Sequence, residues 1–77
     1  MITYEEALEK AKKMKSNING CDEWEKGYVF GNSEDGNYDG GYGHTPVVIT
    51  KKDGRALPMA AFVIEGPGEL LRSFPVE

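Results

Sequence analysis

The chain of 77 residues is short of the side chains that catalytic and metal sites need, with one cysteine, Cys21, and one histidine, His44. A single cysteine excludes a disulfide within the chain and is typical of a reducing compartment. No apolar run approaches the roughly 18 residues that a membrane span needs. The N-terminal sequence carries acids where a signal peptide carries bases and then an apolar core. These absences favour a soluble cytoplasmic protein.

Basic residues are also scarce, with nine Lys and Arg against thirteen Asp and Glu and a formal net charge of −4. The excess lies in residues 20–46, which hold six acids and a single lysine. Phosphate binding needs clustered Lys and Arg, so this distribution argues against nucleic acid or an anionic membrane as partner. It favours a basic protein partner, a cation, or simply a solvated acidic surface.

The length predicts a single domain over residues 1–77, near the lower limit for folding without disulfides or metals. A helix is expected from about residue 3 to residue 16, because Thr3 and Glu6 have the spacing of a capping box. Apolar side chains then recur every three or four residues and form one stripe that must pack on another element: Tyr4, Ala7, Leu8, Ala11 and Met14.

The remainder predicts strands. Residues 24–30 indicate a first strand with Trp24, Tyr28 and Phe30 on one face, and residues 47–50 a buried second strand. A turn at residues 52–54 leads to a third strand over residues 55–57. Residues 59–64 fit either a helical turn or a strand, and residues 69–74 a fourth strand with Leu71 and Phe74 inward. We therefore expect an α+β fold, an N-terminal helix packed on a three- or four-stranded antiparallel sheet in two layers.

The glycine-rich segment between the first two strands contains half of a calcium loop. Asp35, Asn37 and Asp39 stand at positions 1, 3 and 5, and a glycine follows at position 6. Position 12, normally a bidentate glutamate, is Pro46, and neither flank is a predicted helix. Asp, Asn and Gly are also common in any long loop. Calcium binding is thus an alternative hypothesis, and no cofactor is expected.

Catalysis is not expected either. Cys21 and His44 are the only candidate nucleophile and base, and two neighbouring acids, Asp22 and Glu23, disfavour the thiolate. The glycine-rich segment lacks the lysine that a phosphate-binding loop needs. We predict that the chain is not an enzyme.

The glycine-rich loop that carries the half calcium motif is also the predicted partner-binding site. Tyrosine is enriched at protein interfaces because it offers a large contact area at little cost in rotamer entropy. An equally good interpretation is that the rings of Tyr38 and Tyr42 cover the edge of a small core. The candidate contact residues are Asp35, Tyr38, Asp39, Tyr42 and His44.

Three stretches, residues 2–11, 25–30 and 43–54, resemble small bacterial immunity proteins of the immunity protein 35 type, also described as YrhB-like. The likeness covers about residues 2–57, while the glycine-rich loop and residues 58–76 depart from the pattern. The resemblance implies a helix packed on an antiparallel sheet, no catalysis, and neutralisation of a cognate toxin through a tight protein contact. It implies no particular site residues.

The leading hypothesis is therefore a small acidic protein-binding domain, an immunity or inhibitor protein with a basic partner. One alternative is a homo-oligomeric structural or phage-type accessory protein that pairs exposed sheet edges. The other is the calcium-binding module.

Overall fold

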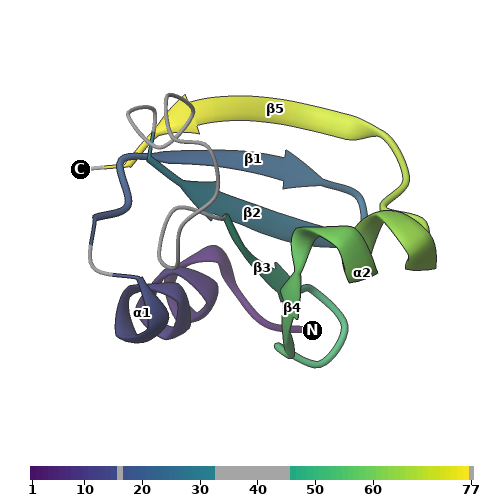
Figure 1. Cartoon of the computed structure of the whole chain (residues 1–77), viewed down its shortest axis with the longest axis horizontal. Helices are drawn as coiled ribbons and strands as arrows, with labels where there is room; N and C mark the ends of the chain where they lie inside the picture. Colours follow the sequence, from purple (N-terminus) through teal and green to yellow (C-terminus); the bar gives the residue numbers. More distant parts are fainter. Residues whose placement is uncertain (16, 33–45, 77) are drawn as a thin grey trace.

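The computed structural model describes residues 1–15, 17–32 and 46–76. In this part of the chain, the elements are α1 (Tyr4–Met14), β1 (Gly20–Trp24), β2 (Gly27–Gly31), β3 (Val47–Thr50), β4 (Ala56–Pro58), α2 (Met59–Glu65) and β5 (Leu70–Pro75). The strands form one antiparallel sheet in the order β4-β3-β2-β1-β5 (Figure 1). The expected α+β arrangement of an N-terminal helix on an antiparallel sheet is confirmed. The sheet has five described strands rather than three or four.

The helix α1 begins as the capping box predicts, with Thr3 as its N-cap. The Thr3 hydroxyl accepts a hydrogen bond from the Glu6 N–H at 3.2 Å. The hydroxyl in turn donates a hydrogen bond to the Glu6 carboxylate at 3.3 Å. Of the predicted stripe, Met14, the last residue of the helix, is 61% exposed, contrary to the prediction. The residue after it, Lys15, is buried.

The larger core lies between α1 and one face of the sheet. Its buried residues include Ala7 and Ala11 of α1 and Phe30, which is fully buried in the central strand. Tyr4 packs its ring edge-on against the rings of Tyr28 at 5.7 Å and Phe74 at 5.3 Å. Small alanines let the helix approach the sheet, and the aromatic rings fill the space beside them.

A smaller core lies on the opposite face, because side chains alternate along a strand. Val29 and Val48 are buried there against Phe62 of α2, with Trp24 packed beside them. Residues 59–64, for which the sequence left two possibilities, therefore belong to a helix. That helix ends at Gly66, whose φ of 92° is the left-handed conformation that glycine adopts without strain.

The predicted first strand over residues 24–30 is wrong, since this stretch is divided between two strands. β1 ends at Trp24 and β2 begins at Gly27. Their turn is bound by a distant segment, because the Glu25 N–H donates to the Glu69 carbonyl and the Lys26 N–H to the Pro67 carbonyl, each at 3.1 Å. The turn moves Trp24 to the face opposite Tyr28 and Phe30, contrary to the prediction.

Leu71 was also expected inward and is instead 53% exposed. Arg72 lies opposite Glu23 and Leu70 opposite Trp24, so the register shifts and Leu71 has no partner in the ladder. This is a β-bulge at the edge of the sheet. Phe74 packs against the larger core as predicted.

Candidate functional site

The residues predicted to bind a partner or calcium lie outside the described residues. They are Asp35, Asn37, Tyr38, Asp39, Tyr42 and His44, all within residues 33–45. Their roles therefore stay predictions. In the ranges that the structure does describe, no group of three or more His, Cys, Asp or Glu side chains could hold a metal ion. Neither α1 nor α2 is long and apolar enough to cross a membrane.

The Cys21 thiol is a buried core group in the structure. It is 3% exposed in the cluster beneath α1. Burial, followed by the negative charges of Asp22 and Glu23, raises the pKa of this thiol to about 12. A nucleophilic cysteine needs the thiolate at neutral pH, so the environment of Cys21 opposes that chemistry.

Glu23, one residue further along β1, is the centre of an ion network on the α1 side of the sheet. Its carboxylate accepts from Lys51 Nζ at 2.8 Å and from Arg72 Nε at 2.6 Å. The Lys51 ammonium also lies 5.0 Å from the centre of the Tyr28 ring. The hydrogen bonds from Lys51 and then Arg72 hold the pKa of the Glu23 carboxyl below its ordinary value.

Acid is expected to weaken the fold through Glu23. Because the folded pKa lies below the ordinary value of 4.5, the stabilisation is complete above that pH and is lost as the pH falls through the folded pKa. Urea denaturation of the wild type and of Glu23→Gln from pH 3 to pH 7 measures this. The variant should have the lower midpoint at pH 7, and the two should converge below pH 4.5. A difference that stays constant over the whole range contradicts this role, and Glu9→Gln, an exposed acid of α1, is the control.

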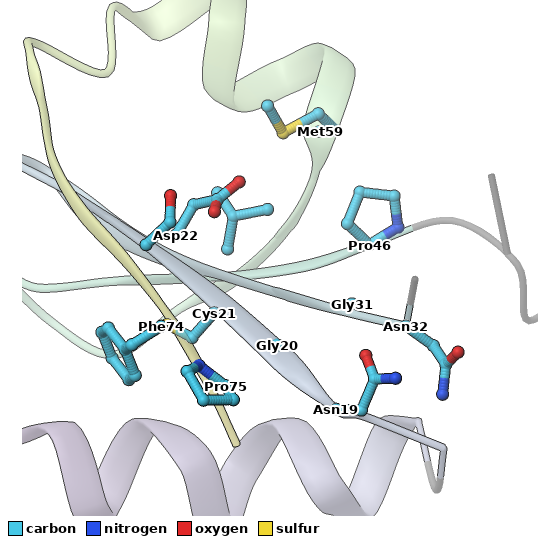
Figure 2. A pocket seen from close by; sticks show the side chains of 12 residues that line it. Asn19, Gly20, Cys21, Asp22, Gly31, Asn32, Pro46, Met59, Phe74 and Pro75 are labelled. Carbon is cyan, nitrogen blue, oxygen red and sulfur yellow. The ribbon is translucent and has the colours of Figure 1, made fainter. Parts of the chain in front are cut away.

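The clearest hollow in the described surface lies on the other face of the sheet, between α2 and the ends of β1, β2 and β5. It has a volume of about 620 Å³. Figure 2 shows Asp22 on the side of Met59, whereas Phe74 points to the side of α1. The lining residues are Asn19, Gly20, Cys21, Asp22, Val29, Gly31, Asn32, Pro46, Met59, Ser73, Phe74 and Pro75.

The floor of this hollow is bare backbone, because Gly20 of β1 lies opposite Gly31 of β2. A Cβ at Gly20 would be 4.0 Å from its nearest neighbour, the Phe74 carbonyl oxygen. A Cβ at Gly31 would be 3.7 Å from Cβ of Pro46. Both distances are ordinary or loose contacts, so the space above the two glycines is free to be filled.

Asp22 carries the only formal charge among the described residues that line the hollow. Its side chain is exposed and has no ion pair within the described chain. Ser73 of β5 lies directly opposite it in the sheet register and on the same face. A carboxylate and a hydroxyl on one face of the sheet place two hydrogen-bond acceptors side by side, and such a pair can bind an N–H donor.

The sequence did not predict this hollow. Gly20 and Gly31 are 11 positions apart, and only the pairing of β1 with β2 brings them together. No local pattern marks Asp22 as different from the other acids of residues 20–46. The signal that could have found the site was the β1–β2 turn, from which the register follows.

Comparison of the chain with protein-family models, with curated proteins and with solved structures found no match in any of the three.

Proposed function

We propose that the chain is a non-enzymatic protein-binding domain of the immunity or inhibitor kind, which acts in the cytoplasm on a basic protein partner. The observation that carries the proposal is the outer surface of α2. Its sequence, MAAFVIE, is apolar at every position but the last, yet only Phe62 is buried. Val63 is 57% exposed and Ile64 is 86% exposed.

A helix that is apolar all round normally lies inside a protein. Burying a Val or Ile side chain is worth roughly 1.5–3 kcal/mol, so leaving two of them in water forgoes a substantial stabilisation. Exposed apolar groups at one place are typical of a surface that another protein covers. The net charge of −4 supports a partner of opposite charge, which electrostatic attraction would guide to the surface.

The alternative of homo-oligomers that pair through sheet edges has less support. Of the two edge strands in the described sheet, β4 has three residues and ends in Pro58. The other, β5, has the bulge at Leu71 and ends in Pro75. Short edges, bulges and prolines are the features by which natural sheets avoid pairing with other chains.

The test is co-expression with the product of the adjacent gene, read out as growth and as a complex in size-exclusion chromatography. Growth should be restored and the two proteins should elute together.

Ile64→Glu should weaken the complex at least about tenfold, since a carboxylate in an apolar contact must be desolvated. Met14→Glu, an equally polar change at an exposed residue of α1, should leave it unchanged. The double variant Tyr42→Ala with Asp39→Ala tests the predicted contribution of the loop. The absence of both a complex and growth would refute the proposal.

A further inference from the structure

We propose that the hollow beside α2 takes one lysine or arginine side chain of the protein partner, and that the Asp22 carboxylate binds its charge. This inference rests on the proposed function, since it names the chemistry by which the partner is recognised. The hollow and the exposed residues of α2 share one element through Met59. That residue lines the hollow and begins the helix that carries Val63 and Ile64.

The negative charge of Asp22 in the hollow has no ion-pair partner among the described residues. Glu23, the next residue of β1, is neutralised by Lys51 and Arg72, and Glu23 shares the α1 side of the sheet with Tyr28, its partner in the register. Asp22 points to the opposite face and receives neither cation. A carboxylate in this position gains most from a cation that comes from another molecule, through a charge-assisted hydrogen bond.

The shape of the hollow suits a side chain with an apolar stem and a charged end. Val29, Pro46 and Met59 provide apolar walls, and the facing glycines leave a floor without side chains. Lysine and arginine bury their methylene stems against apolar surface while the charged group remains at a polar position. Ser73, opposite Asp22, offers a hydroxyl oxygen as a second acceptor for the N–H groups of the incoming cation. A volume of about 620 Å³ lies within the range of small-ligand pockets.

A metal ion is not the expected occupant. Calcium takes six to eight oxygen ligands, and the described residues that line the hollow supply one carboxylate. An anion is disfavoured because no Lys, Arg or His is among the described residues that line the hollow.

The first experiment probes the hollow without the partner. Isotope-labelled protein at low salt is titrated with n-butylguanidinium chloride, and in parallel with n-butylammonium chloride and with n-butanol, while backbone amide shifts are recorded. Both cations should give saturable shifts at residues 20–22, 31 and 73, and butanol should give none. Asp22→Asn should weaken the binding of the cations about tenfold. Glu9→Gln, which removes the same charge from an exposed position of α1, should bind as the wild type does.

A second variant separates the shape of the hollow from its charge. Gly31→Val places a side chain in the open space above the floor and keeps Asp22, so it should reduce the binding of the cations as strongly as Asp22→Asn. Unchanged shifts elsewhere in the spectrum show that the variant is folded. Shifts that do not saturate, or that are the same in Asp22→Asn as in the wild type, overturn the proposal.

The two proposals fail in different ways. If the wild-type chain forms no complex with its partner, the proposed function is refuted whatever the hollow binds. If the complex forms but Asp22→Asn binds the partner as tightly as the wild type, the hollow is not the site and the proposed function stands.

Discussion

Replacement of Phe30 by alanine is expected to unfold most of the domain at 25 °C. Phe30 is fully buried in β2, the central strand, and its ring lies 6.0 Å from that of Tyr4 and 6.1 Å from that of Tyr28. Truncating a buried phenylalanine costs about 3–5 kcal/mol, because the surrounding groups cannot close the cavity completely. A domain of this size has a free energy of unfolding of only about 3–5 kcal/mol.

Urea denaturation followed by circular dichroism tests this prediction. Leu71→Ala is the control, since Leu71 is about half exposed at the bulge and should change the free energy of unfolding by less than about 0.5 kcal/mol. If Phe30→Ala unfolds cooperatively within about 1 kcal/mol of the wild type, this core does not provide the stability that its packing indicates.

Replacement of Gly27 by valine is the second change with a large expected effect. A Cβ at Gly27 would lie 3.0 Å from the Ile49 carbonyl oxygen and 3.1 Å from Cε1 of Phe62. The carbonyl is fixed by the pairing of β2 with β3, in which Gly27 lies opposite Thr50. Valine must therefore displace the Phe62 ring and shift the strand, and overpacking of this kind costs about 1–3 kcal/mol.

The same strand supplies the control for Gly27→Val. Gly31→Val adds the same atoms at the other end of β2, where the nearest contact of the Cβ is an ordinary 3.7 Å. It should leave the midpoint of urea denaturation nearly unchanged. Equal losses in the two variants would mean that the loss of glycine itself, rather than the contact with Phe62, is responsible. In the background Phe62→Leu, Gly27→Val should cost less than in the wild type, because the two positions are coupled.

The parts of the fold that depend on neighbouring residues could be predicted from the sequence. The capping box at Thr3 fixes the start of α1, and the β-branched run of β3 identifies a buried strand. The turn after β3 was also predicted. There the Gly54 N–H donates to the Thr50 carbonyl at 2.9 Å, and Gly54 has a φ of 69° that favours glycine. Each of these signals lies within a few positions of the structure it determines.

The errors concern residues whose positions are determined by distant segments. The turn between β1 and β2 depends on hydrogen bonds to residues 67 and 69, including one from the Glu69 N–H to the Glu25 carboxylate across 44 positions. Leu71 is exposed because β5 shifts its register against β1. No periodicity within seven or eight residues contains this information. The floor of the hollow follows from the pairing of β1 with β2, which the turn between them sets, so it was missed together with that turn.

The pairing of β5 with β1 has a consequence for how the molecule folds. The other neighbours in the sheet are consecutive along the chain, whereas β5 joins residues 70–75 to residues 20–24. Contacts between such distant segments are costly in chain entropy and form late. During synthesis the side of β1 that later pairs with β5 therefore remains an unpaired edge until residues 70–76 have left the ribosome. Until then the nascent chain lacks the residues of β5 that line the hollow, so the proposed binding of a cation there should arise only after β5 has paired.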